Sequence, residues 1–344
     1  MEINLLDDNQ LSLLRGLIAD AGKVVVVVHK SPDGDAIGSL LSWGMYLKNL
    51  GKEVTCVIPD AAPDFLMWLP NAQTIVRYDK HPDKVRAAFD AADLVCCLDF
   101  NDLARINEVE PLAKACKAPR LLIDHHENPT VEAALSLSFP SMSSTCELIF
   151  RLLWQLGSYD EMTLQMAQCI YCGMMTDTGA FTYNSNSPAV YLIISHLLEK
   201  GIDKDKIYNR VFNNYSANAV KFRSYVIYRK LKVIHRLHAS YFFVTKEEMK
   251  RFQFIKGDLE GVVNIPQKIK KLKLSISLRE DTEKPNLIHV SLRSGNGFHC
   301  RPVAEQFFNG GGHDDASGGR LTCSVEEAEQ IVLRAITAFK EQLQ

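Results

Sequence analysis

The first half of the chain alternates between short, wholly apolar runs and longer amphipathic segments. The most apolar run, KVVVVVH, places five valines in succession at residues 24–28, as expected of a strand buried on both faces. Similar runs predict strands at residues 53–58, 93–99 and 119–126. Helical periodicity predicts helices at residues 36–51, 82–91, 103–117 and 143–157. This alternation predicts an α/β fold with a doubly wound parallel sheet.

The second half follows a different pattern. Residues 187–230 are mainly helical in periodicity. Shorter, more closely spaced strands are predicted at residues 231–237, 241–244, 272–280 and 286–294, with helices at 302–308 and 324–343. The pattern predicts a smaller α/β domain with a mixed sheet and a cleft between the two domains. The predicted division is 1–188 for the first domain, 189–228 for a helical connector and 229–344 for the second.

The composition is that of a soluble globular protein. Of the 344 residues, 47% are hydrophobic and 23% are charged, which is ample for a core. No apolar run approaches about 18 residues, so no membrane span is expected, and the opening MEINLLDDNQ lacks the pattern of a secretory signal. The nine cysteines lie mostly in apolar segments, which indicates reduced thiols and a cytoplasmic location.

Charge is unevenly distributed along the chain. The net charge is −2, yet residues 200–300 contain 21 Lys and Arg against 9 Asp and Glu. A basic segment beside an acidic remainder indicates a negatively charged ligand and a carboxylate-rich site, although a solvated basic face gives the same count. Because proteins that hold long nucleic acids are usually more basic overall, a short anionic substrate fits better and no stable complex with long nucleic acid is expected.

Acidic and histidine residues recur where the predicted strands end. They are His29, Asp33, Asp35, Asp99, Asp124, His125, His126 and Asp177. Ligand sites in parallel sheets form beyond the carboxyl ends of the strands, so these residues are expected to converge, although each fragment alone also fits an ordinary strand end or turn. Clustered carboxylates need a counter-charge. Oxygen and imidazole ligands favour manganese, with magnesium, cobalt, iron and zinc as competitors, and this many ligands predict two divalent ions.

Several stretches, in this order, resemble the motifs of the DHH phosphoesterase family: HKSPDGDAIGS, the aspartate of CLDF, IDHH and TDTGAF. The later SLRS (291–294) and NGGGHDDASGG (309–319) resemble the DHH-associated C-terminal domain, so the resemblance spans nearly the whole chain. It implies one metal ion held by His29, Asp33 and Asp99. It implies a second held by Asp35, Asp99, His125 and Asp177, with Asp99 shared.

The resemblance also implies roles for residues around the metals. His126 would face the substrate phosphate, and Asp124 would orient a histidine. Together with the shared Asp99, these are the predicted catalytic residues, and a water activated by the two ions would attack phosphorus.

The C-terminal motifs imply a phosphate-binding loop. The predicted substrate-binding residues are Arg293, Ser294, Gly311, Gly312 and His313. Glycines let a backbone approach an anion and point N–H groups at it, and arginine binds phosphate through a bidentate fork. From composition alone the glycines would equally form a tight turn. Many relatives have alanine where this chain has Ser317, so a hydroxyl near the ligand is expected to alter preference only slightly.

Weaker candidates lie outside these motifs. Arg105 could reach phosphate or could be a surface residue. Five aromatic residues could stack on a base, with core packing as the alternative for each: Phe65, Trp68, Tyr78, Phe100 and Tyr183.

Within the family, the compact chain is similar to nano-RNases and to phosphatases of adenosine 3′,5′-bisphosphate. The expected function is therefore two-metal hydrolysis of short oligoribonucleotides to mononucleotides. Alternatives are hydrolysis of cyclic or linear dinucleotides, then of polyphosphate or pyrophosphate. A different class, a non-catalytic binding protein, would be expected to lack metal ligands. The final helix could support a homodimer or pack on its own domain, and the in-cell metal and the polarity of attack on RNA stay open.

Overall fold

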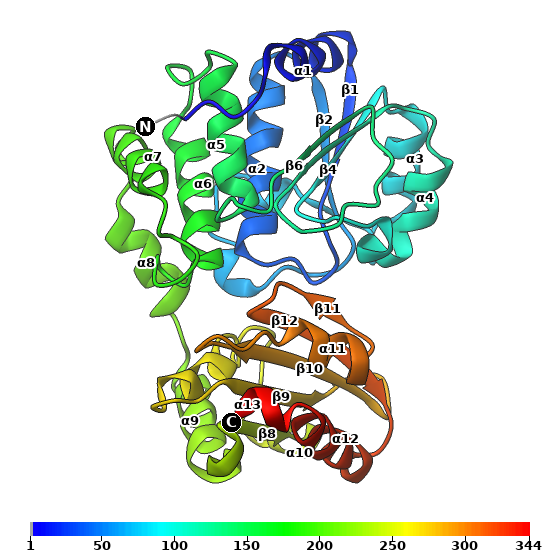
Figure 1. Ribbon diagram of the computed structural model, residues 1–344. Helices are drawn as coiled ribbons and strands as arrows, with labels where there is room; N and C mark the ends of the chain where they lie inside the picture. The colour runs from blue at the N-terminus through cyan, green and yellow to red at the C-terminus, as the bar shows by residue number, and fades with distance from the viewer. Residues whose placement is uncertain (1–2) are drawn as a thin grey trace. The chain divides into compact units, whose positions relative to one another are not determined.

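The computed structural model describes residues 3–344, and the chain divides into two units, Met1–Asn214 and Tyr215–Gln344 (Figure 1). The helices α7 (Pro188–Glu199) and α8 (Lys204–Phe212) belong to the first unit, whereas α9 (Ala217–Tyr225) belongs to the second. The boundary therefore falls inside the segment that the sequence predicts as a connector. None of the helices among residues 3–344 has both the length and the apolar character needed to cross a bilayer.

The first unit is built on a six-stranded, wholly parallel sheet with the order β3-β2-β1-β4-β5-β6. Its strands are β1 (Lys23–Val27), β2 (Glu53–Ile58), β3 (Val76–Arg77), β4 (Leu94–Leu98), β5 (Arg120–Asp124) and β6 (Leu135–Ser138). The predicted doubly wound parallel sheet is confirmed. The pattern misses β3, which has only two residues, and β6, which is only half apolar.

The valines of β1 explain why such a strand is apolar throughout. Val24 and Val26 belong to the core under one face of the sheet, and Val25 and Val27 belong to the core under the other. Helices cover both faces, α2, α5 and α6 on one side and α3 and α4 on the other (Figure 1). The helices of this unit that precede α7 are α1 (Asp8–Asp20), α2 (Gly34–Asn49), α3 (Pro82–Ala91), α4 (Glu110–Ala115), α5 (Thr145–Gln155) and α6 (Leu164–Asp177).

Two features of this unit bear on the site. Helix α2 is buried along most of its length against α6, and a Cβ added at Gly38 would lie 2.6 Å from the carbonyl oxygen of Cys169. The single helix predicted at 103–117 is instead a 3₁₀ segment, Leu103–Val109, followed by α4. The break coincides with the left-handed backbone of Asn107 (φ 47°) and with Pro111, which lacks an amide hydrogen.

The second unit has a mixed six-stranded sheet with the order β11-β12-β10-β9-β8-β7, as predicted in type. Every pair is antiparallel except β8 with β9. Its strands are β7 (Lys232–Ile234), β8 (Ala239–Val244), β9 (Leu274–Glu280), β10 (Leu287–Ser294), β11 (Gly311–Gly312) and β12 (Ala316–Thr322). The glycine-rich β12 is absent from the predicted strands.

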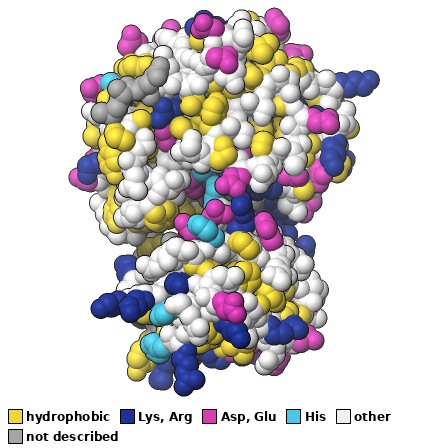
Figure 2. Space-filling view, in the orientation of Figure 1, with side chains coloured by type: hydrophobic (Ala, Val, Ile, Leu, Met, Phe, Trp, Pro, Cys, Tyr) yellow, Lys and Arg dark blue, Asp and Glu magenta, His cyan; other side chains and the backbone are white. Residues whose placement is uncertain are grey.

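Helices of the second unit contribute to two separate cores, which contain alternate residues of β8. The helices are α9, a π-helical turn at Val226–Lys230, α10 (Lys246–Arg251), α11 (Arg301–Phe307), α12 (Val325–Ala338) and α13 (Lys340–Leu343), with 3₁₀ turns at His235–Leu237 and Val262–Lys268. Alternate residues of β9 and β10 pack with α11 and α12 in one core. Lysine and arginine side chains are spread over the visible face of this unit rather than gathered in one place (Figure 2).

Candidate metal centre and anion-binding loop

The candidate metal centre lies at the carboxyl ends of β1 and β4, the neighbouring strands at which the strand order reverses. His29 follows β1, and its Nδ1 lies 2.9 Å from the carbonyl oxygen of Lys30. That contact makes Nδ1 the donor and leaves the lone pair of Nε2 facing Asp99 Oδ2 at 3.5 Å and Asp33 Oδ2 at 3.9 Å. Burial lowers the pKa of His29. A neutral imidazole lone pair facing two carboxylates calls for a cation between them.

Helix N-termini hold the next two carboxylates. Asp33 caps α2, its Oδ1 accepting hydrogen bonds from the amides of Asp35 (3.1 Å) and Ala36 (3.0 Å). Asp35 is only 1% exposed, and its two oxygens accept the amide hydrogens of Thr145 (2.6 Å) and Cys146 (2.8 Å) at the start of α5. These donors and the helix dipole fix the Asp35 carboxylate, although burial raises its pKa.

Asp99 follows β4 in a left-handed backbone conformation (φ 62°), which is uncommon for residues other than glycine. It is 2% exposed, and burial together with the charge of Asp35 raises its pKa well above the usual range. The hydroxyl of Thr145 donates a hydrogen bond to Asp99 Oδ1 at 3.0 Å. Thr145 thus orients Asp35 through its amide and Asp99 through its side chain, a role that the sequence pattern does not reveal beyond a helix start.

His125 brings the remaining carboxylates together. Its Nε2 lies 3.5 Å from Asp99 Oδ1, 3.5 Å from Asp177 Oδ2 and 3.8 Å from Asp35 Oδ2. Burial alone would lower the pKa of His125, but the surrounding carboxylates, Asp177 foremost, raise it to about 9. Asp177 is the last residue of α6, where the negative end of the helix dipole disfavours a carboxylate. This geometry concentrates negative charge that nothing on α6 offsets.

The donor set fits divalent cations. The donor atoms of His29, Asp33 and Asp99 lie within 4.8 Å of one another. The same holds within a second group, formed by Asp35, His125 and Asp177. The nitrogen–oxygen separations of 3.5–3.9 Å are those of ion-pair neighbours and exceed the usual length of a hydrogen bond. Among residues 3–344, no lysine or arginine forms an ion pair with Asp33, Asp35 or Asp99. Oxygen and imidazole donors together suit manganese and its neighbours.

The histidine next in sequence has a different partner. His126 Nδ1 lies 2.7 Å from Asp124 Oδ1, which fixes a proton on Nδ1 and orients the ring. Asp124 is fully buried, and its other oxygen, Oδ2, has no hydrogen-bond partner in the described part of the chain. Burial raises the pKa of Asp124. Arg105 lies close enough to Asp124, Asp33 and His29 for its positive charge to act on their pKa values, so it borders this site.

The second site is the loop between β11 and β12, with the end of β10 beside it. Arg293 pairs with Ala316, and Gly312 pairs with Ser317, so arginine and glycines share one end of the sheet. A Cβ at Gly310 would lie 1.8 Å from the carbonyl oxygen of Gly318, so only glycine fits there. Gly312 has φ 138°, where other residues are strained.

Internal hydrogen bonds fix this loop. His313 donates its amide hydrogen to the Ala316 carbonyl at 2.9 Å, and the Ser317 hydroxyl donates to the His313 carbonyl at 2.7 Å. Ser317 is 4% exposed, so its hydroxyl fastens the loop instead of facing a ligand. The Ser294 hydroxyl likewise accepts the Cys300 amide at 3.0 Å. The predicted substrate-binding residues are therefore neighbours, with Ser294 also anchoring the backbone.

These features define a class: a two-unit α/β protein with an acid- and histidine-rich site at the switch point of a parallel sheet and a glycine loop on a mixed sheet. The family model for the DHH family, N-terminal domain, matches residues 23–174, and that for the DHHA1 domain matches residues 238–342. The chain belongs to the DHH family and carries a DHHA1 domain.

Relatives agree with that assignment. The crystal structure of an exopolyphosphatase-related protein from Bacteroides fragilis superposes with a TM-score of 0.93 at 43% identity, covering 98% of each chain. A bifunctional oligoribonuclease and PAP phosphatase, NrnA, from Thermus thermophilus is 27% identical over 323 residues, 93% of this chain and 91% of that protein. RecJ from Thermus thermophilus, solved in complex with Mn²⁺, shares the fold (TM-score 0.56, 14% identity), covering 99% of this chain and 56% of RecJ.

Proposed function

We propose that the protein is a metal-dependent phosphoesterase that hydrolyses short oligoribonucleotides to mononucleotides and removes a phosphate from adenosine 3′,5′-bisphosphate. The observation that carries the proposal is the convergence of Asp33, Asp35, Asp99 and Asp177 on the imidazoles of His29 and His125, while no lysine or arginine among residues 3–344 forms an ion pair with Asp35 or Asp99. The name of the Thermus thermophilus relative, which covers most of both chains, supports the choice of substrate.

The residues proposed to hold two divalent ions, manganese foremost, are His29, Asp33 and Asp99 for one and Asp35, Asp99, His125 and Asp177 for the other. Two such ions, when bound, would activate a water and stabilise negative charge on a phosphoryl group. Asp99 is suited to serve both, because its Oδ2 faces His29 and its Oδ1 faces His125. Thr145 holds that carboxylate by its hydroxyl, so both oxygens keep fixed directions.

His126 is proposed as the residue that meets the substrate phosphate. Asp124 keeps a proton on Nδ1, so a protonated His126 presents its Nε2–H as a donor to a phosphate oxygen. In the second unit, Arg293, the imidazole of His313 and the amides of Gly311 and Gly312 are proposed to bind a phosphate of the substrate. The loop is held by Ser294 and Ser317, which leaves these donors preorganised.

We further propose a cytoplasmic location and transient binding of short substrates, without a stable complex with long nucleic acid or with membranes. A homodimer is the proposed alternative to a monomer, and light scattering of the purified chain distinguishes the two.

One experiment tests substrate choice. The protein with manganese is given labelled diribonucleotide, long single-stranded RNA, adenosine 3′,5′-bisphosphate, cyclic di-AMP and polyphosphate, and initial rates are compared. Fastest turnover of the dinucleotide, with slow attack on long RNA, is expected. The similar Bacteroides fragilis structure is that of an exopolyphosphatase-related protein, which makes polyphosphate the second candidate substrate. Fastest release of phosphate from polyphosphate would replace the proposal by that activity.

A further inference from the structure

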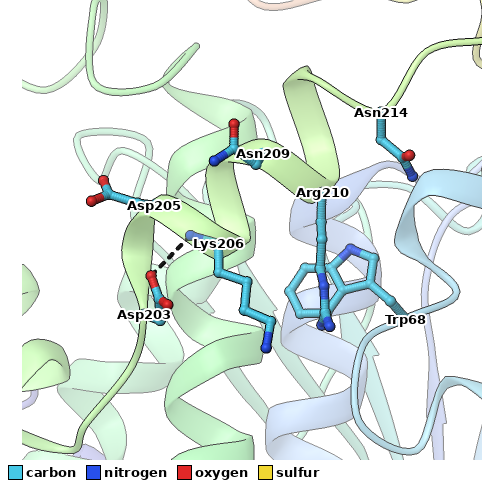
Figure 3. Close-up of a pocket in the computed structure, with 7 residues that line it drawn as sticks. All are labelled: Trp68, Asp203, Asp205, Lys206, Asn209, Arg210 and Asn214. Carbon is cyan, nitrogen blue, oxygen red and sulfur yellow. Dashed lines mark hydrogen bonds between the residues drawn. The ribbon is translucent and has the colours of Figure 1, made fainter.

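The first unit carries an open cavity of about 790 Å³ that none of the proposed catalytic residues lines. Its walls are α8, the segment that follows α8 and the loop after β2. The lining residues are Trp68, Asp203, Asp205, Lys206, Asn209, Arg210 and Asn214 (Figure 3). The loop after β2 lies at the same carboxyl edge of the sheet as His29, and Asp60 of this loop accepts the Ser31 amide hydrogen at 2.6 Å.

In this cavity the two aspartates have bonding partners on α8, whereas the two basic residues form no ion pair with described residues. Asp203 caps α8 by accepting the Lys206 amide hydrogen at 2.9 Å, and Asp205 pairs with Lys204 at 2.6 Å. Lys206 and Arg210, one helical turn apart on α8, form no ion pair with any described residue. Two neighbouring cations without a carboxylate partner favour an anionic ligand.

The aromatic wall adds a second property. The guanidinium carbon of Arg210 lies 4.8 Å from the centre of the Trp68 ring, and the two side chains lie together in Figure 3. The indole Nε1 is buried yet has no hydrogen-bond partner among the described residues, which is rare for a tryptophan. A ligand that drew the guanidinium aside would open the ring face and give Nε1 an acceptor.

We propose that this cavity is a nucleotide-binding subsite, distinct from the metal centre. Lys206 and Arg210 bind the phosphate, Trp68 stacks on the base, and the side-chain amide of Asn214, which points toward Trp68 in Figure 3, hydrogen-bonds the base edge. The ligand class is a nucleoside monophosphate, either free or as one unit of a bound oligoribonucleotide. The second alternative rests on the proposed function, whereas the first does not.

Tryptophan fluorescence tests the site directly. Adenosine 5′-monophosphate is titrated into the full-length protein, and the difference between wild type and Trp68→Phe isolates the signal of Trp68, because Trp43 is fully buried and Trp154 packs on the core. Lys206→Gln/Arg210→Gln should raise the dissociation constant about tenfold or more, since each charged hydrogen bond contributes on the order of a factor of ten. The matched control, Lys204→Gln, removes a positive charge from the same helix outside the cavity and should leave the titration unchanged.

Two further comparisons make the outcome decisive. Binding to the loop of the second unit is removed by Arg293→Gln, which should leave the Trp68 signal intact. A signal lost in Arg293→Gln but retained in Lys206→Gln/Arg210→Gln, or no signal in wild type, would overturn the subsite.

If the double variant raises the Michaelis constant for a tetranucleotide more than for a dinucleotide, the subsite holds part of the substrate. If the constants shift equally or not at all while the titration is lost, the subsite holds a free nucleotide. A chain that hydrolyses none of these substrates yet keeps the Lys206-dependent titration would refute the proposed function alone.

Discussion

The proposed metal centre of the first unit and the glycine loop of the second are built on opposite principles. The centre is formed by carboxylates and imidazoles, and burial together with the charges of neighbouring carboxylates raises the pKa values of Asp35 and Asp99. The loop is formed by backbone held in place by close approach and by neutral hydrogen bonds. The first should therefore respond to changes of charge and to metal, and the second to changes of shape. The comparison would be wrong if the centre responded mainly to changes of shape, or the loop mainly to changes of charge.

The largest effect is expected for Asp99→Ala. Because Asp99 faces both groups of donor atoms, its loss should lower manganese-dependent hydrolysis of a diribonucleotide at least about a thousandfold, the factor that corresponds to 4 kcal/mol of transition-state stabilisation. Initial rates with and without manganese measure this.

Asp99→Asn serves as the matched control for folding. It keeps the shape of the side chain and removes one of several like charges, so the metal-free variant should melt at or above the wild-type temperature, whereas the stabilisation by added manganese should be largely lost. Wild-type turnover in either variant would exclude the proposed role of Asp99 in metal-dependent hydrolysis, whereas a wild-type protein without any turnover would favour a binding protein.

The second prediction concerns shape in the loop. Gly310→Ala places a Cβ 1.8 Å from the Gly318 carbonyl oxygen, so it should lower the free energy of unfolding of the second unit by about 1–3 kcal/mol, as overpacking does. Gly311→Ala is the control, since nothing lies within 4 Å of its added Cβ. Chemical denaturation followed by a probe in the second unit measures both. Equal stability of the two variants would show that close approach does not determine this loop.

The third prediction separates positioning from folding at Thr145. Thr145→Val removes the hydroxyl that donates to Asp99 Oδ1, so the turnover number should fall about tenfold, the equivalent of one hydrogen bond to a charged group. Thr145→Ser keeps the hydroxyl and should retain most of the rate. If the manganese concentration needed for half-maximal activity rises in Thr145→Val but not in Thr145→Ser, the hydroxyl acts by positioning the Asp99 carboxylate. If serine and valine lose the same activity, the methyl group and its packing matter instead.

Thr145 also shows where prediction from sequence ends. The parallel sheet was predictable because both faces of β1 are covered, which makes the strand apolar at every position. The convergence of His29, Asp99 and His125 was predictable because strand ends share an edge. The contact between Thr145 and Asp99 joins residues 46 positions apart through one hydroxyl, so no local periodicity records it. In the same way, the cavity at Trp68 is completed by α8, which lies more than 130 residues later in the chain. The glycines of β12 hide the alternation of apolar residues by which a strand is predicted.

The smallest effect is expected for the stability of the second unit at low pH. The carboxylate of Asp281 accepts the amide hydrogens of Glu283 (2.8 Å) and Lys284 (2.7 Å) and faces His289 Nε2 at 2.6 Å. Burial acts against these bonds, yet they lower the pKa of Asp281 to about 2. A carboxyl whose pKa is lower in the folded state stabilises the fold above its unfolded pKa, and that contribution is lost as pH falls from about 4 towards 2. The loss should be on the order of 1–2 kcal/mol, and Asp281→Asn should remove this part of the pH dependence. Unfolding of the second unit measured between pH 2 and pH 5, at constant ionic strength, gives the difference; parallel curves for wild type and variant would show that the charge of Asp281 is not what holds the turn between β9 and β10.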